Sequence, residues 1–297
     1  IMTDTDSDEE FYQSVMLHQG IYRYEEGNFI EAIPIFDRCI QEHSDARSYF
    51  YRAMSNCMLG NYEISLDDFS SAIQYDPDMD EAYFNRGNAY AKLNRDEEAI
   101  SDFNRAIEKD GIVRKYWYHR GLVRAAKGDY QEAYEDFDQV VKMDAEKSYD
   151  VYYNRGLVKY QIGEYQEALQ DFDIVLNLDD ECGLGYYNRG NVRYRLTRYE
   201  EALQDFDKGL TLLPDTAGMY LNRALAKERL GMVAEDDFNK AVELDPGLNE
   251  KVLHHKKMRR LEKLSKFLMS ILPVLILILA FLLYKYWDRI SDYWNRA

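Results

Sequence analysis

Proline and cysteine are scarce in this sequence of 297 residues, and basic residues are fewer than acidic ones. Only 5 prolines and 16 glycines occur, which excludes collagen-like and low-complexity chains, while 46% hydrophobic residues suffice for a folded core. Acidic residues outnumber basic ones by 54 to 37, and the net charge of −17 would repel a phosphate backbone. We therefore expect no binding to nucleic acid.

The sequence also lacks the residue patterns of disulfide frameworks, catalytic sites and metal sites. Cys39, Cys57 and Cys182 are far apart and form no C-x-x-C pair, so we interpret them as small buried residues in a reducing compartment. No Gly-rich phosphate loop, nucleophile elbow or H-E-x-x-H helix occurs. The pair His254 and His255 lies among basic residues and is expected to be solvated rather than metal-bound. We predict no enzymatic activity, cofactor, metal or small-molecule substrate.

The first twelve residues, IMTDTDSDEEFY, are rich in acid. A signal peptide needs a basic start followed by an apolar stretch, so this segment is not expected to direct export. We predict that residues 1–12 form an acidic segment ahead of the folded region.

A phenylalanine recurs at intervals of 32 to 35 residues along most of the chain, at Phe36, Phe69, Phe103, Phe137, Phe172, Phe206 and Phe238. A glycine or alanine precedes it by sixteen residues in six copies, and an alanine often precedes it by four. Small residues at helical spacing let two helices approach closely while the phenylalanine fills the space between them. Turn signals such as Gly128-Asp129 and Gly163-Glu164 separate the two halves. Each copy therefore predicts a helix, a turn and a second helix.

These features resemble the tetratricopeptide repeat (TPR) family, and residues 149–182 match its marked positions with Tyr152, Gly156, Gly163, Tyr165, Ala168 and Phe172. The resemblance implies an all-α, right-handed superhelical solenoid of seven helical hairpins over residues 13–248. We place the repeats at 13–45, 46–79, 80–113, 114–148, 149–182, 183–216 and 217–248. Repeat seven lacks two residues near Met232, so its hairpin is expected to turn irregularly.

Two charged residues occur together in repeats two to seven. An arginine stands at the seventh position (Arg52, Arg86, Arg120, Arg155, Arg189 and Arg223), and an aspartate directly precedes the phenylalanine (Asp68, Asp102, Asp136, Asp171, Asp205 and Asp237). Repeat one has Gln19 and Ile35 instead. Their joint loss indicates a half-buried ion pair between two helices, within one repeat or between neighbours. It also marks repeat one as an N-terminal cap.

The resemblance further implies that the first helices line a concave groove. The predicted groove residues stand at the sixth position or one turn further on: Asn85, Asn88, His119, Asn154, Asn188, Asn191 and Asn222. An Asn amide both donates and accepts, so such a row can bind the backbone of an extended protein or peptide partner. The alternative is that these side chains are only polar surface residues, which are common in this type of repeat. As exposed polar residues, they are expected to tolerate replacement by alanine without loss of stability.

Residues 267–284, FLMSILPVLILILAFLLY, carry no charge. As a helix they would span about 27 Å, close to a bilayer core. We predict a transmembrane helix over 267–287, with an aromatic belt at Tyr284, Tyr286 and Trp287, and a short interfacial tail over 288–297. A buried core helix is the less favoured interpretation.

The segment before the predicted span, residues 249–266, is basic. Seven basic residues face only Glu262 over 251–266. We expect this juxtamembrane helix first to pack on repeat seven and then to meet anionic lipid headgroups through Lys256, Lys257, Arg259, Arg260, Lys263 and Lys266. The positive-inside rule places the repeats in the cytoplasm.

These features predict a single-pass membrane protein that displays a TPR scaffold to the cytoplasm and recruits protein partners. A membrane-bound co-chaperone or targeting receptor that hands clients to the membrane is one alternative. Co-chaperones of this family hold the C-terminal carboxylate of heat-shock proteins with a clamp of basic and polar residues. The first lysine of that clamp would stand at the fifth position of a repeat, and no repeat has a lysine there. A regulatory arm of a larger membrane enzyme complex is a second alternative.

Overall fold

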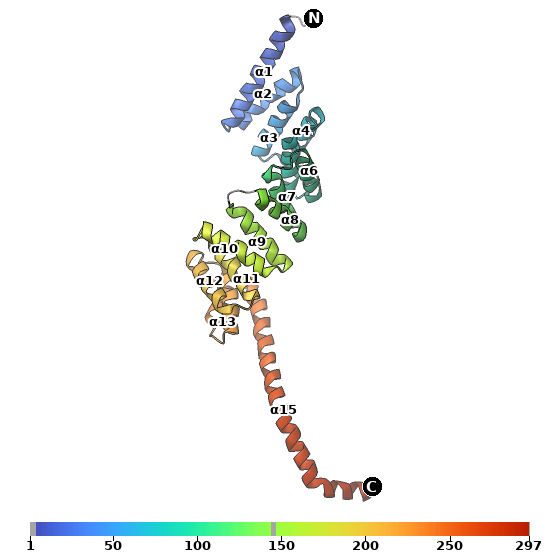
Figure 1. Cartoon of the computed structure of the whole chain (residues 1–297), viewed down its shortest axis with the longest axis vertical. Helices are drawn as coiled ribbons and strands as arrows, with labels where there is room; N and C mark the ends of the chain where they lie inside the picture. Colours follow the sequence, from blue (N-terminus) through green and yellow to red (C-terminus); the bar gives the residue numbers. More distant parts are fainter. Residues whose placement is uncertain (1–3, 144–146, 297) are drawn as a thin grey trace. The chain divides into compact units, whose positions relative to one another are not determined.

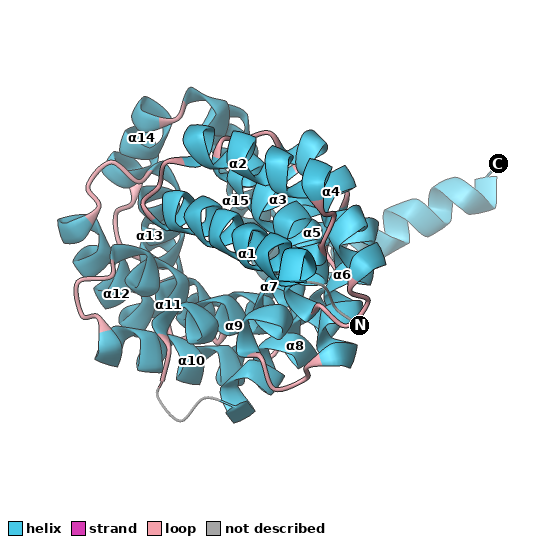
Figure 2. Ribbon diagram, turned by 90° about the horizontal axis from the view of Figure 1, so that it is seen from above, coloured by secondary structure: helices cyan, strands magenta, loops and turns pink. Residues whose placement is uncertain are grey.

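The computed structural model describes the backbone of residues 4–143 and 147–296, and the side chains of residues 12, 14–143 and 147–286. Helices joined by short loops make up this part of the chain, with no strand in it (Figure 2). The elements, in chain order (Figure 1), are α1 (Asp4–Glu25), α2 (Phe29–Glu42), α3 (Ala46–Met58), α4 (Tyr62–Tyr75), α5 (Asp80–Lys92), α6 (Asp96–Lys109), α7 (Arg114–Lys127), α8 (Tyr130–Met143), α9 (Tyr149–Ile162), α10 (Tyr165–Leu178), α11 (Gly183–Arg195), α12 (Tyr199–Leu212), α13 (Ala217–Arg229), α14 (Glu235–Leu244), the 3₁₀ turn η1 (Pro246–Leu248) and α15 (Asn249–Arg296).

The first fourteen helices form seven hairpins, which confirms the predicted all-α TPR solenoid. Odd-numbered helices are the first of each hairpin and even-numbered helices the second. Two details differ between repeats. Helix α1 begins at Asp4, so most of the predicted acidic segment belongs to its first turns rather than preceding it. Helix α14 has 10 residues where α12 has 14, in agreement with the irregular last hairpin expected near Met232.

The chain divides into two compact units, one ending at Asp205 and one beginning at Phe206, inside α12. In the first unit α3, α5, α7 and α9 each contact the second helices on either side along the chain, and consecutive first helices also contact each other. No contact between consecutive second helices is found in the described part of this unit. A row of helices that touch along one side curves toward that side, so the first helices line the concave face of this unit.

The repeated phenylalanine is the centre of each hairpin. All seven are at most 1% exposed. Gly87 shows why a small residue is needed opposite this ring, because a Cβ there would lie 2.9 Å from Cε1 of Phe103. Thr197 takes the turn position that glycine holds in other repeats and adopts a φ of 61°, a left-handed conformation that a β-branched residue rarely takes.

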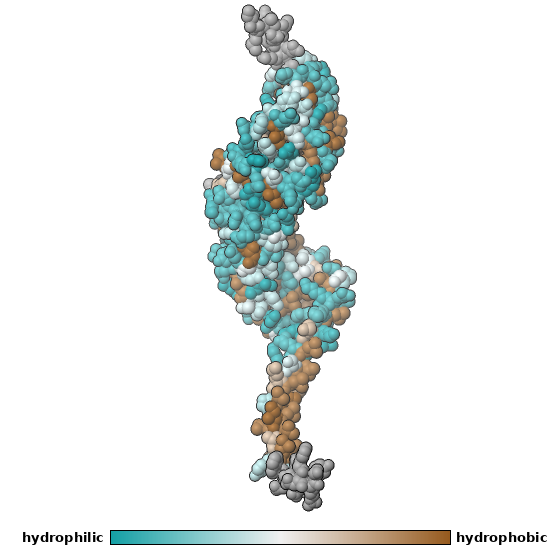
Figure 3. Space-filling model, turned by 90° about the vertical axis from the view of Figure 1, so that its right-hand side faces the viewer, coloured by the Kyte–Doolittle hydropathy of each residue, from teal (hydrophilic) through white to brown (hydrophobic). Residues whose placement is uncertain are grey.

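In the second unit, α15 begins by packing on the last hairpin and then continues without cover. Val252 is 3% exposed and clusters with Leu221 and Phe238. Over Pro246–Tyr286 this is a helix long and apolar enough to cross a membrane, and its most apolar window is 0% buried (Figure 3). Pro273 lies inside the helix without ending it. The side chains of Trp287 and of the predicted tail 288–297 lie outside the described residues.

Candidate peptide-binding groove

The concave side of the first unit carries one repeated strip of side chains. In α5, α7, α9 and α11 the second and thirteenth positions are exposed and the sixth and ninth are half-buried. Spacings of four, three and four residues place these positions on one helix face. We call them the inner stripe; it comprises Glu81, Asn85, Asn88, Lys92, Lys115, His119, Leu122, Ala126, Asp150, Asn154, Leu157, Gln161, Leu184, Asn188, Asn191 and Arg195. All predicted groove residues of this unit lie on it. Asn222 is half-buried at the sixth position of α13, in the second unit.

Two of the predicted asparagines link neighbouring repeats. Asn154 donates from Nδ2 to the Tyr118 hydroxyl at 3.1 Å and to the backbone oxygen of Asp150 at 2.8 Å. Asn188 donates in the same way to the Tyr153 hydroxyl at 3.0 Å. Each tyrosine stands at the fifth position of the preceding first helix. Part of the predicted ladder therefore holds first helices together.

The fifth position of α5 is Phe84, which has no hydroxyl to accept a hydrogen bond. The sixth position of the next first helix is therefore occupied by an aromatic ring that packs on Phe84. His119 packs edge-on to Phe84 with the ring centroids 5.0 Å apart, and its Nδ1 lies 2.8 Å from Asn88 Oδ1. Burial, assisted by Lys115 and Lys92, lowers the pKa of His119 and favours the neutral imidazole. His119 therefore fills a place between two repeats as an uncharged group.

The amides keep a free acceptor. Asn85 donates to the backbone oxygen of Glu81 at 2.7 Å, so Nδ2 of Asn85, Asn154 and Asn188 each has a partner inside the protein. No residue in the described part of the chain donates to Oδ1 of these three amides. The sequence predicted exposed amides that donate and accept freely, whereas these three amides are half-buried and present mainly their carbonyl oxygens.

These bonds change the expected effect of mutation. Replacing Asn188 with alanine should lower the free energy of unfolding by about 0.5–1.5 kcal/mol, because the hydrogen bond to Tyr153 is lost. Asn177, exposed on α10, is the matched control, and its replacement by alanine should change stability by less than about 0.5 kcal/mol. Denaturant unfolding of the full chain measures both. Equal stability of the two variants would show that the inter-repeat bond contributes nothing.

An ion-pair network lies behind the inner stripe, as the charge pattern predicted. In repeat five, Arg155 donates from Nη2 to Asp171 at 2.7 Å and from Nε at 3.0 Å, while its Nη1 reaches Asp138 of the preceding repeat at 2.9 Å. Arg155 also lies over the ring of Tyr152, 5.2 Å from its centroid. Arg155 therefore forms one ion pair within its own repeat and a second ion pair with the preceding repeat. The same arginine–aspartate pairing occurs at Arg52, Arg86, Arg120, Arg189 and Arg223.

A second cation meets the same aspartate in repeats four to seven, and the sequence analysis missed it. The four residues stand at the eleventh position: Arg124, Lys159, Arg193 and Lys227. Their recurrence in four successive repeats was the available signal. Burial raises the pKa of Asp205 more than Arg189 and Arg193 lower it. The carboxylate is therefore held in the core at a desolvation cost, which its cations must offset.

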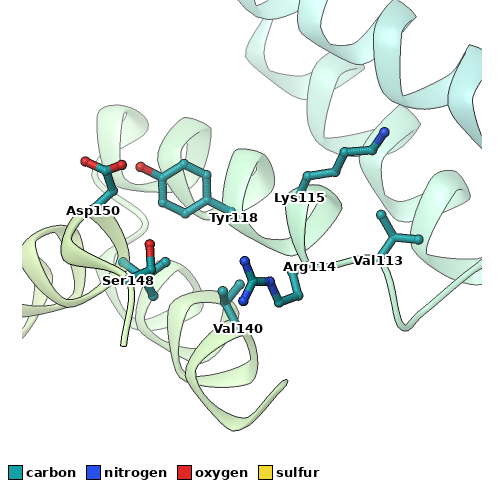
Figure 4. Close-up of a pocket in the computed structure, with 8 residues that line it drawn as sticks. Val113, Arg114, Lys115, Tyr118, Val140, Ser148 and Asp150 are labelled. Carbon is teal, nitrogen blue, oxygen red and sulfur yellow. The ribbon is translucent and has the colours of Figure 1, made fainter. Parts of the chain in front are cut away.

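A pocket of about 390 Å³ opens beside the inner stripe, lined by Val113, Arg114, Lys115, Tyr118, Val140, Ser148, Asp150 and Val151. Its floor is apolar, since Val140 is 2% and Val151 5% exposed. Asp150 lies beside the Tyr118 hydroxyl at one side, and Lys115 lies at the other (Figure 4). The pocket can hold one apolar side chain, and its lining carries one carboxylate, Asp150, and two cations, Arg114 and Lys115.

The described residues contain no group of three or more side chains suited to hold a metal ion. Cys39 and Cys182 are buried, and with Cys57 they are unpaired. His254 is exposed as expected, whereas His255 is half-buried, with its Nε2 2.6 Å from a carboxylate oxygen of Glu228 on α13. The α15 helix packs there, which brings the imidazole to the last repeat.

The predicted lipid-facing residues divide into two groups. Lys256 pairs with Glu235 at 2.8 Å, and Arg259 lies 3.7 Å from Glu228, so both are engaged by the last hairpin, and Lys266 pairs with Glu262 on its own helix. The other three are exposed and have no acidic group within ion-pair distance among the described residues: Lys257, Arg260 and Lys263.

Stacked helical hairpins with a side-chain stripe on the concave face define a helical-repeat binding scaffold. Family models described as tetratricopeptide repeat or TPR repeat match residues 57–94, 80–111, 115–182 and 183–216. The chain belongs to the tetratricopeptide repeat family. None of these models describes a catalytic family.

Solved structures share the fold at low identity. The C-terminal part of a TPR repeat-containing protein from Cytophaga hutchinsonii is 19% identical with a TM-score of 0.64, covering 77% of this chain and 95% of that one. YrrB, described as a TPR protein with an unusual peptide-binding site, is 22% identical with a TM-score of 0.56, covering 64% and 97%. MamA from Desulfovibrio magneticus RS-1 is 22% identical with a TM-score of 0.54, covering 57% and 96%. No curated protein compared with this chain matches it.

Proposed function

We propose that this protein is a membrane-anchored TPR scaffold that binds an extended segment of a protein partner along the inner stripe. The observation that carries the proposal is the same exposed and half-buried pattern in four successive first helices. TPR proteins bind peptide or protein partners, which supports the assignment. Neither catalysis nor a cofactor is part of the proposal.

The side chains of the stripe suit a backbone-directed mode of binding. Oδ1 of Asn85, Asn154 and Asn188 can accept hydrogen bonds from partner N–H groups at the repeat spacing. The pocket between Lys115 and Asp150 would hold an apolar side chain of the same segment. Hydrogen bonds to the partner's backbone would then supply affinity. The pocket would supply specificity, because it accepts an apolar side chain of the partner.

The anchor in this proposal is α15. Its uncovered apolar length supports a membrane span, and the basic residues before it support a cytoplasmic position for the repeats by the positive-inside rule. Lys257, Arg260 and Lys263, which have no ion-pair partner among the described residues, would contact anionic headgroups, while Lys256 and Arg259 fasten the helix to the last hairpin.

Site-specific photo-crosslinking in native membranes tests the groove. A photoreactive residue replaces Lys92, Gln161 or Arg195, the exposed thirteenth positions of three first helices. The matched controls on the second helices lie nine residues later and are equally exposed: Ser101, Gln170 and Gln204. We expect the same protein adduct from the three inner positions and none from the controls.

Two other results would redirect the assignment. Adducts of equal yield from inner and outer positions would contradict binding in the groove. Adducts from the inner positions to many short-lived chains rather than one partner would favour the co-chaperone or targeting-receptor alternative.

A further inference from the structure

One face of α15 carries an uninterrupted row of leucine and isoleucine. The residues alternate at spacings of three and four: Leu261, Leu264, Leu268, Ile271, Leu275, Ile278 and Leu282. The next positions in the same spacing are Lys257 and Lys285, so the row has a defined start and end. We call it the heptad row, and its 22 residues span about 33 Å of helix.

The polar and helix-breaking residues of this segment all lie off the heptad row. Six such residues fall between its members: Glu262, Lys263, Ser265, Lys266, Ser270 and Pro273. Lipid tails surround the apolar run on all sides and give no reason for Ser270 and Pro273 to lie off one face. Leu261 and Leu264 extend the row into the basic segment, between Arg260 and Lys266, where a simple membrane anchor requires no apolar face.

The heptad row has no cover in the protein. Six of its seven members are 43–53% exposed, and Ile271 is half-buried. No described residue outside α15 belongs to a hydrophobic cluster with them. An average spacing of 3.5 residues keeps a row facing the axis of a left-handed bundle, so the surface complementary to it is an identical row.

We propose that α15 helices from several copies of this chain pack in parallel along the heptad row. Every copy inserts in the same direction, which makes the bundle parallel. Leucine stands at each first position of the heptad and isoleucine at two of the three fourth positions, a choice that favours three or four helices over two. The inference rests on the proposed membrane anchoring of α15.

Such a bundle would place several solenoids at one point of the membrane. A partner that carries two binding segments would then meet the second groove at a high effective concentration and dissociate more slowly. The scaffold would thus favour multivalent partners without any change in the groove itself.

Disulfide scanning of the full chain in lipid vesicles tests the proposal. The native cysteines are first replaced (Cys39→Ala, Cys57→Ala and Cys182→Ser), and single cysteines are then introduced on α15. Cysteine at position 264, 268 or 275, on the heptad row, should give about ten-fold more disulfide-linked dimer on oxidation than cysteine at 263, 269 or 277. Leu268→Ala combined with Leu275→Ala should reduce the dimer formed at position 264, whereas Met269→Ala combined with Leu277→Ala should not.

Each contrary outcome has a separate meaning. Crosslinking that is uniform around the helix, strongest on the face of positions 263, 269 and 277, or absent would overturn self-association along this row. Extraction at alkaline pH tests membrane anchoring independently of self-association. A chain that is extracted contradicts the anchor, and the scanning pattern still decides whether the helices associate.

Discussion

Replacing Asp171 with asparagine should destabilise repeat five by about 3–5 kcal/mol, the largest effect of a single substitution that we expect in the solenoid. Asp171 is 1% exposed and accepts from both Arg155 and Lys159. Asparagine would leave the buried Lys159 without a counter-charge and Arg155 with only Asp138 of the preceding repeat. Amide hydrogen exchange in α9 and α10 should accelerate by about 150- to 5,000-fold, because local opening becomes easier by that free energy.

Two further variants identify the cause. Asp180, exposed in the loop after α10 and without an ion pair, is the matched control, and Asp180→Asn should leave exchange unchanged. Replacing the whole group by apolar residues, with Arg155→Met, Lys159→Met and Asp171→Leu together, should recover most of the loss, since no charge then stays buried alone. Slow exchange in Asp171→Asn would show that the network does not stabilise the repeat.

Removing the apolar part of α15 should release the protein from the membrane in which we propose that this helix is anchored. The full chain should stay in the membrane pellet after alkaline extraction, because each Leu or Ile side chain moved into lipid contributes about 1.5–3 kcal/mol. A chain ending at Lys266 should appear almost entirely in the soluble fraction with its helices intact. Sedimentation followed by circular dichroism measures both properties.

The position of the cut matters. Val252, His255 and Lys256 pack on the last hairpin, so a chain ending at Glu250 should lose about 1.5–3 kcal/mol of stability in that hairpin. A chain ending at Lys266 keeps these contacts and serves as the control. Pelleting of the chain ending at Lys266 would contradict the membrane role of α15.

The repeat architecture could be predicted from sequence because burial imposes it. Phe103 and Gly87 must meet at one helix crossing, and that requirement recurs at a nearly fixed interval. The charge pattern of Arg155 and Asp171 was equally readable, since neither residue can be buried without the other.

The roles of the asparagines were less accessible. Whether Asn154 faces a partner or the Tyr118 hydroxyl depends on how two neighbouring helices rotate against each other, which residue spacing does not specify. His255 was misjudged for a similar reason, because its basic neighbours in sequence do not reveal Glu228 on a different helix. These two contacts between helices could be found only in the structure.

The most direct test of the account follows the crosslinked partner through fractionation. A photoreactive residue at position 161 is placed in the full chain and in the chain ending at Lys266, and the adduct is sought in pellet and supernatant. We predict an adduct that pellets with the full chain and is soluble with the shortened one. An adduct that pellets equally with both chains, or that forms equally from position 170, would contradict a groove that α15 holds at the membrane.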